Sequence, residues 1–231
     1  MSNVDFKGFQ STAVGFLQEL SKNNNRSWFT QNKQRYETDV LTPAINYISA
    51  MSEPLAAISP NFTAIPKRIG GSLMRIYRDT RFSKDKTPYK TNIGIQFRHL
   101  LAKDVHAPGY YVHISPEEIF IGIGTWHPPS DALFKIREHI VDNPINWISI
   151  QNNKTFHSKF ELIGDKLKTV PRGFDKNHEL IDDLRWKDFI AVRNLDEREI
   201  QNVNFVEISQ DLFKSAQNYM MFLCDAVGVP F

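Results

Sequence analysis

The chain has almost no cysteine, and it lacks a long apolar run. Only one of its 231 residues is a cysteine, Cys224, so no internal disulfide can form and the reducing cytoplasm is the expected location. The first ten residues show no basic stretch followed by an apolar one, so we expect no signal peptide. No apolar run approaches the roughly 20 residues that cross a bilayer, so we expect no membrane partner.

A strong imbalance of charge is also missing. Lys and Arg number 28 and Asp and Glu number 26, which gives a formal net charge of +2 with neutral histidine. A charge this small argues against a broad nucleic-acid footprint but permits a local one. The seven histidines show no metal-binding spacing, and Gly122-Ile123-Gly124 lacks the third glycine of a dinucleotide fingerprint. We therefore predict neither a metal nor a cofactor.

Apolar periodicity predicts helices at both ends of the chain and strands between them. The expected helices cover about residues 8–21, 27–40, 43–55, 131–141, 144–150, 179–186 and 210–227, the last capped by Ser209. The expected strands cover residues 73–77, 93–101, 109–115, 118–124, 160–163, 189–192 and 205–208. The short connector Ser115-Pro116-Glu117 predicts a hairpin between the third and fourth strands. This order predicts an α+β fold, with a mainly antiparallel sheet flanked by N-terminal and C-terminal helices. No linker divides the pattern, so we expect a single domain over residues 1–231.

Positive charge is concentrated in one segment, residues 75–90, with the sequence RIYRDTRFSKDKTPYK. Its six cations face only two acids, Asp79 and Asp85, so the segment carries +4 and the rest of the chain sums to −2. Four of the cations recur at every third position, which fits neither an ideal strand nor an ideal α-helix. The spacing therefore favours an irregular segment that arranges several charges around one concavity.

The excess of cations over acids leaves two interpretations open. The first is a site for a small molecule that bears a phosphate or carboxylate, because an Arg fork matches two anionic oxygens and Lys adds a point charge. The second is a structural or partner-binding domain, in which the basic motif is an internal ion-pair network that fixes a loop. A nucleic-acid-binding module is a further alternative, because aromatic residues accompany the cations.

The first interpretation makes specific predictions about residues. We expect Arg75, Arg78, Arg81 and Lys86 to converge within one cleft, with Asp79 orienting one guanidinium. The candidate ligand-binding residues are Arg75, Arg78, Arg81, Lys84, Lys86, Tyr89, Lys90 and Arg172. The acid–base candidates are Asp79, Asp85 and His113, and nothing in their spacing marks them as a pair. The sequence itself identifies neither a reaction nor an oligomeric state.

A second polar and aromatic cluster lies at residues 23–36, NNNRSWFTQNKQRY. Helix starts attract anions through free amide groups, and Lys33 could add charge there. Ordinary helix capping, with Trp28 and Phe29 as core anchors, is the favoured interpretation.

Several motifs together resemble one known family. They are RIYRDTRFSKDKTPYKTN from residue 75, FLQELSKNNNRSWFTQNKQRYE from residue 16, PGYYVHISPEEIFIGIGTWHPP from residue 108 and GDKLKTVPRGFDKNHELIDDLRWKDF from residue 164. In this order they resemble the conserved hypothetical proteins of domain-of-unknown-function family 2461. The resemblance spans nearly the whole chain and implies a single domain. It implies neither a reaction nor catalytic residues.

Overall fold

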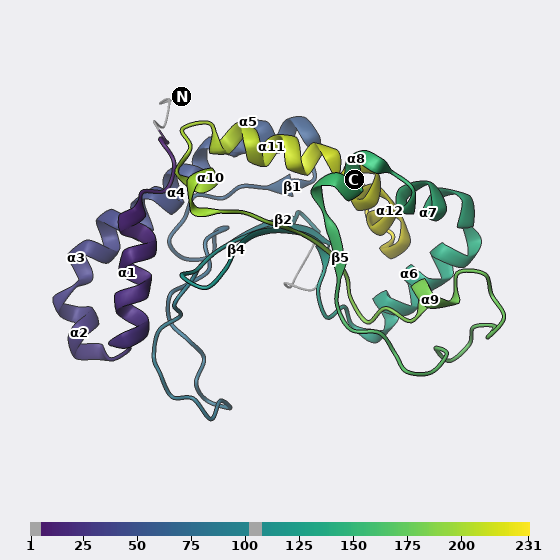
Figure 1. The fold of residues 1–231 in the computed structure, drawn as a ribbon, viewed down its shortest axis with the longest axis horizontal. Coiled ribbons are helices and arrows are strands. Elements are labelled where there is room, and N and C mark those ends of the chain that lie inside the picture. The colour runs from purple at the N-terminus through teal and green to yellow at the C-terminus, as the bar shows by residue number, and fades with distance from the viewer. Residues whose placement is uncertain (1–5, 102–107) are drawn as a thin grey trace.

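The computed structural model describes residues 6–101 and 108–231, and these residues form an arch around one curved sheet (Figure 1). The sheet has the strand order β1-β2-β3-β4-β6-β5, and every neighbouring pair is antiparallel. Its strands are β1 (Phe62–Thr63), β2 (Ile93–His99), β3 (Gly109–Ile114), β4 (Ile119–Thr125), β5 (Glu161–Ile163) and β6 (Phe189–Asn194). The predicted α+β fold with an antiparallel sheet is confirmed, as is the β3–β4 hairpin.

Helices cover one face of the sheet and form a lobe at each end of the arch (Figure 1). The first lobe is built from α1 (Ser11–Lys22), α2 (Arg26–Gln31), α3 (Lys33–Arg35) and the π-helix η1 (Tyr36–Leu41). The covering helices are α4 (Thr42–Ala50), α5 (Ser52–Ile58), α10 (Glu197–Gln201) and α11 (Phe205–Ser215). The second lobe contains α6 (Ser130–Asp142), α7 (Pro144–Gln151), α8 (Lys154–Lys159), α9 (Ile181–Leu184) and α12 (Gln217–Val227).

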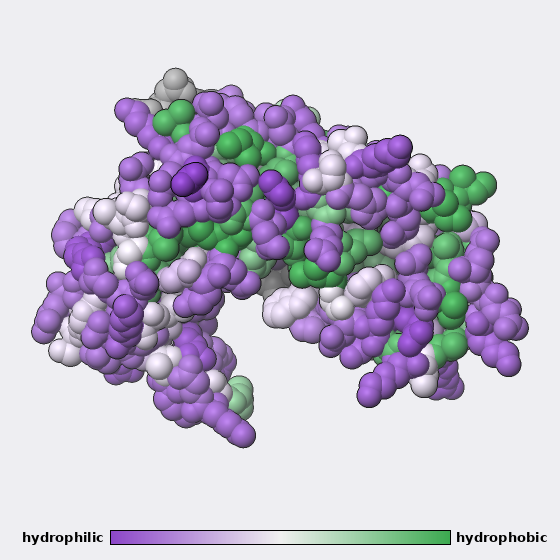
Figure 2. Space-filling model, viewed as in Figure 1, coloured by the Kyte–Doolittle hydropathy of each residue, from purple (hydrophilic) through white to green (hydrophobic). Residues whose placement is uncertain are grey.

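Successive side chains of a strand point to opposite faces of the sheet, one buried beneath the helices and the other on the concave side of the arch. On β3, Tyr110, Val112 and Ile114 are fully buried beneath the helices, whereas Tyr111 and His113 are only partly buried on the opposite face. Figure 2 shows the molecule hollowed between the two lobes. The concave face is therefore the face of the sheet opposite α4 and α11.

One predicted strand is wrong. Residues 205–208 form the first turn of α11, and the expected closing helix is divided at Ala216 into α11 and α12. Phe205 is fully buried against the rings of Phe9 and Tyr47, so its burial comes from distant rings and not from a sheet. Ser209 is not a cap: it is buried within α11, where its hydroxyl donates to the Phe205 carbonyl and accepts from the Tyr47 hydroxyl.

Two further segments differ from the sequence-based expectation. Residues 73–77 make only isolated bridges, Leu73 with Ile95 and Tyr77 with Tyr89, so no continuous strand forms there. The expected helix over 27–40 divides into α2, α3 and η1, and Asn25 caps α2 by accepting from the Trp28 amide at 3.0 Å. Ordinary helix capping was the favoured interpretation of this cluster, and the residue that provides the cap is Asn25.

Candidate anion-binding site

The basic segment, residues 75–90, leaves the edge of the sheet and returns to it as a narrow ribbon. The Met74 amide donates to the Gly94 carbonyl at 2.8 Å, which fixes the start of the ribbon beside β2. The two arms are joined where the Lys90 amide donates to Ile76 at 2.7 Å and the Arg78 amide donates to Pro88 at 2.9 Å. Residues 79–87 therefore form an irregular tip, which projects away from the arch (Figure 1).

Two cations of the ribbon are neutralised by its own acids. Asp79 accepts from Arg81 Nε at 3.0 Å and from Arg81 Nη2 at 2.7 Å, so Asp79 does orient one guanidinium. Arg78 is paired with the Asp85 carboxylate and with the Thr87 hydroxyl. The ion-pair interpretation therefore describes the tip of the ribbon.

These ion pairs determine the chemistry of the two acids. Hydrogen bonds from Arg81 lower the pKa of Asp79 to about 2, and a hydrogen bond from Arg78 is the main cause that lowers the pKa of Asp85 to about 2. Carboxylates that are this acidic stay ionised at neutral pH and accept protons poorly. Asp79 and Asp85 are thus better suited to holding guanidinium groups than to acid–base catalysis.

The other candidates on and beyond the ribbon are dispersed. Lys84 is exposed, and Lys86 donates to the Thr80 carbonyl at 2.8 Å. Tyr89 is 5% exposed and stacks on Phe29 with ring centroids 4.1 Å apart, and Asn24 bonds both its amide and its carbonyl. Arg172 is exposed in the segment between β5 and α9. Of the four residues expected to converge, only Arg75 lines the cavity between η1 and β2.

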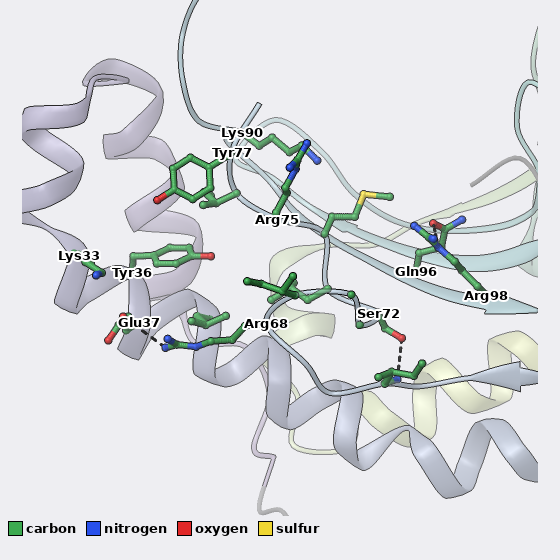
Figure 3. A pocket seen from close by; sticks show the side chains of 18 of the residues that line it. Lys33, Tyr36, Glu37, Arg68, Ser72, Arg75, Tyr77, Lys90, Gln96 and Arg98 are labelled. Carbon is green, nitrogen blue, oxygen red and sulfur yellow. Dashed lines mark hydrogen bonds and ion pairs between the residues drawn. The ribbon is translucent and has the colours of Figure 1, made fainter. Parts of the chain in front are cut away.

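That cavity has a volume of about 740 Å³ and lies between η1, residues 63–77 and the concave side of β2 (Figure 3). We call it the cationic cavity. Within residues 6–101 and 108–231, its charged lining residues are one acid, Glu37, and five bases, Lys33, Arg68, Arg75, Lys90 and Arg98. Its hydroxyl-bearing lining residues are Tyr36, Thr63, Ser72 and Tyr77. Elements distant in sequence thus bring five cations around one space.

Arg75 and Lys90 are the part of the cavity wall where positive charge most clearly lacks an acidic partner. Their side chains lie beside one another on the two arms of the ribbon (Figure 3). Among the described residues, no carboxylate oxygen lies within 4.0 Å of either group. Burial lowers the pKa of Lys90, and the positive charge of Arg75 lowers it further. An anion placed between them would offset both effects.

The opposite wall carries the only carboxylate that the described residues contribute to the cavity. Arg68 lies 3.6 Å from Glu37, so one of the five cations has a partner. Burial raises the pKa of Tyr36 to about 12, although the nearby Arg68 acts in the opposite direction. Tyr36 is therefore a neutral phenol that can donate a hydrogen bond into the cavity.

Sequence reasoning identified Arg75 and Lys90 but missed Arg68 and Arg98. Arg98 lies on β2 with Gln96, and both alternate with the fully buried Phe97. That alternation was a readable signal that Arg98 leaves the core face. Arg68 lies in an irregular stretch before Gly70, where no periodicity indicates a direction.

The third acid–base candidate, His113, lies on β3 in the middle of the concave face. Its ring stacks on Phe120 with centroids 4.7 Å apart and an interplanar angle of 4°. Burial lowers the pKa of His113, against the opposing effect of Glu118 and Glu117. It is therefore a neutral imidazole at physiological pH.

The described residues contain neither a metal-binding cluster nor a helix that could span a membrane. No group of three or more His, Cys, Asp or Glu side chains in residues 6–101 and 108–231 is arranged to hold a metal ion. No helix in the same ranges has both the length and the apolar character of a membrane span.

The α+β fold with its antiparallel sheet and basic ribbon defines the class of this protein. The chain belongs to the family described as conserved hypothetical protein (DUF2461), whose model matches residues 12–222. The match covers both lobes, the ribbon and the whole sheet. No curated protein and no solved structure matches the chain.

Proposed function

We propose that this protein binds a small molecule bearing a phosphate or carboxylate group in the cationic cavity. The observation that carries the proposal is the lining itself, in which five cations accompany one carboxylate. Cations that repel one another in a partly desolvated space are stabilised by an anion, and a guanidinium can bind two of its oxygens at once. Arg75, Lys90, Arg68 and Arg98 are the proposed ligand-binding residues.

The size of the cavity favours a small molecule. Ligand pockets commonly enclose about 300–1,000 Å³, and the volume of about 740 Å³ lies within that range. The lining also includes apolar side chains such as Phe29, Leu73 and Ile76. A ligand with an anionic group at one end and an apolar or neutral body would match both parts of the wall.

The direct test is to bind anions to variants that remove one charge each. We expect Lys90→Met to weaken the binding of inorganic phosphate, citrate or dihydroxyacetone phosphate by about tenfold or more. A hydrogen bond to a charged group is worth roughly 1.5–3 kcal/mol, and 1.4 kcal/mol is a factor of ten in Kd. Isothermal titration calorimetry and the ligand-induced rise in melting temperature measure the effect.

Arg81→Met is the matched control for that experiment. It removes a cation from the same ribbon, but this cation is already paired with Asp79 and does not line the cavity. Its affinity for each anion should stay within about twofold of the parent, since exposed charges act weakly through screened solvent. Equal losses in the two variants, or no binding of any anion by the parent, would contradict the proposal.

Nucleic-acid binding by the ribbon tip is the second candidate. The observation that favours it is Phe82, which is 95% exposed with the Arg81 guanidinium 5.7 Å from its ring centroid. Exposed aromatic rings flanked by cations can stack on unpaired bases. Fluorescence anisotropy with labelled single-stranded DNA and RNA at low salt tests this candidate. Phe82→Ala should weaken such binding while leaving the binding of phosphate unchanged.

A further inference from the structure

Residues 72–78, which we call the edge segment, form an outer edge beside β2 and along the ribbon. Alternate residues of this segment hydrogen-bond β2 or the returning arm of the ribbon through a backbone group: Ser72, Met74, Ile76 and Arg78. In an extended chain, the residues between such positions direct their N–H and C=O groups to the opposite edge. Those residues are Leu73, Arg75 and Tyr77. Within residues 6–101 and 108–231, nothing hydrogen-bonds the backbone N–H or C=O of these three.

The edge segment forms a wall of the cationic cavity. Nine consecutive residues, 69–77, line the cavity, and two of them, Gly70 and Gly71, have no side chain. Successive side chains of an extended chain point to opposite faces, so this unbroken run means that the backbone itself borders the space. Since β2 and the returning arm occupy the inner edge, the outer edge is the one that borders it. η1 lies across the cavity and contributes Tyr36 and Glu37 (Figure 3).

The cations of the cavity are spread along its walls. Arg75 and Lys90 lie beside one another on the ribbon (Figure 3). Arg68 lies toward Glu37 on the opposite wall, and Arg98 lies on β2. A single phosphate or carboxylate contacts only the cations beside it, whereas carboxylates spaced along an extended chain contact cations at several places. The distribution of charge therefore favours a ligand with repeated acidic groups.

We propose that the ligand of the cationic cavity is an extended acidic peptide that adds a strand to the edge segment. Its backbone pairs with Leu73, Arg75 and Tyr77, as in other proteins that bind a peptide by extending a sheet. Its Asp or Glu side chains contact Arg75 and Lys90. An extended chain spans about 13 Å from Leu73 to Tyr77 at about 3.3 Å per residue, so about five peptide residues cover the edge. This inference rests on the proposed anion site and names the class of its ligand.

A phosphorylated metabolite would make only part of these contacts. It could neutralise Arg75 and Lys90, but it has no row of N–H and C=O groups to pair with the edge. A nucleic-acid strand lacks such a row as well. Unpaired backbone groups in a partly desolvated place cost free energy, and an added peptide strand removes that cost at three residues at once.

The affinity for a synthetic peptide tests the charge of the ligand. The probe is acetyl-Glu-Val-Glu-Val-Glu-amide, which has acidic side chains and no terminal charge. We expect calorimetry to give it a Kd at least about tenfold lower than that of acetyl-Gln-Val-Gln-Val-Gln-amide. Lys90→Met should weaken the binding of the acidic peptide about tenfold or more. Arg81→Met should change it by less than about twofold, because Arg81 is paired with Asp79 and does not line the cavity.

N-methylation of the same peptide tests the backbone pairing. One derivative carries a methyl group on the nitrogen of each Val residue, and the other carries one on the nitrogen of each Glu residue. Only alternate residues of an added strand direct their N–H groups to the neighbouring edge. One derivative should therefore bind at least about tenfold more weakly than the unmethylated peptide, and the other should bind within about threefold of it.

Hydrogen exchange followed by NMR locates the pairing on the protein. The amides of Leu73, Arg75 and Tyr77 should exchange at least about tenfold more slowly when the acidic peptide is bound. The Met74 amide is the internal control, because it already donates to the Gly94 carbonyl at 2.8 Å. Its exchange rate should change less than the rates of its two neighbours.

Binding of citrate and phosphate decides the anion site separately. Suppose that either one binds and loses affinity in Lys90→Met. Strand addition is then disproved if the acidic peptide binds no more tightly than its Gln counterpart, or if both methylated derivatives bind as well as the unmethylated peptide. It is also disproved if the bound peptide leaves the exchange of Leu73, Arg75 and Tyr77 unchanged. In each of these cases the anion site stands. If the peptide, citrate and phosphate all fail to bind, both proposals fail.

Discussion

Gly124→Ala is expected to lower the free energy of unfolding by about 3–5 kcal/mol. Gly124 is the last residue but one of β4 and has a φ of +108°, a region that side chains rarely adopt, and such strain costs roughly 1–3 kcal/mol. An added Cβ would also lie 2.1 Å from the Phe189 carbonyl oxygen on β6. Overpacking of this kind costs a further 1–3 kcal/mol or so, because backbone atoms cannot move aside as a side chain can. Equilibrium unfolding in guanidinium chloride measures the change.

Gly15→Ala provides the matched control for the same substitution. Gly15 lies within α1, and no atom lies within 4 Å of its added Cβ. Alanine is favoured over glycine in a helix interior by roughly 0.5–1 kcal/mol, so this variant should be more stable than the parent. If the free energy of unfolding of Gly124→Ala lies within about 1 kcal/mol of that of the parent, β4 and β6 do not approach each other this closely at Gly124.

Elements that depend on a local pattern could be predicted from the sequence, whereas those that depend on distant contacts could not. The strands at 93–99, 109–114 and 119–125 were predicted because alternating apolar residues reflect a local requirement, one face in and one face out. The strand predicted at 205–208 failed because its apolar residues pack on rings from α4 and the N-terminal segment. Contacts with Tyr47 and Phe9 are set by the fold and leave no trace in the local pattern.

The same limit applies to the site. The excess of cations in residues 75–90 could be counted, and Arg75 and Lys90 do line the cavity. The sequence could not show which cations would be neutralised, because the pairing depends on a turn at the ribbon tip. That turn brings Asp85 back to Arg78 across seven residues. Arg68 and Arg98 come from other elements, so only the packed sheet and lobes bring them to the same space. A charge count thus located one wall of the cavity and could not locate the others.

The concave face of the sheet carries polar side chains on two neighbouring strands, β2 and β3. Gln96 and Arg98 of the cationic cavity lie on β2, and Tyr111 and His113 lie on the neighbouring strand β3, where the Tyr111 hydroxyl is 3.3 Å from His113 Nδ1. Helices cover the opposite face of the sheet, and the strand ladder sets the direction of each side chain on the concave face, which no second layer of the described residues covers (Figure 1). Rigid strands are better supports for such groups than loops are.

Trp147→Ala is expected to lower the free energy of unfolding by about 3–5 kcal/mol, the usual range for an aromatic residue removed from a core. Trp147 is fully buried in α7 and contacts the rings of Phe189, Tyr219 and Phe222. Its Nε1 donates to the Asp183 carboxylate at 3.0 Å, which ties α7 to α9. Alanine would leave both a cavity and an unpartnered carboxylate, so the second lobe should lose its attachment to β6.

Two variants divide that loss into its parts. Trp147→Phe keeps an aromatic ring and removes the donor to Asp183, so we expect a smaller loss of about 1–2 kcal/mol. Ile145→Ala changes the same helix at a side chain that is 81% exposed, and its effect should stay within about 0.5 kcal/mol. Denaturant unfolding followed by circular dichroism measures all three. A Trp147→Ala protein as stable as Ile145→Ala would mean that α7 does not pack on the sheet, because a fully buried indole cannot be removed without leaving a cavity.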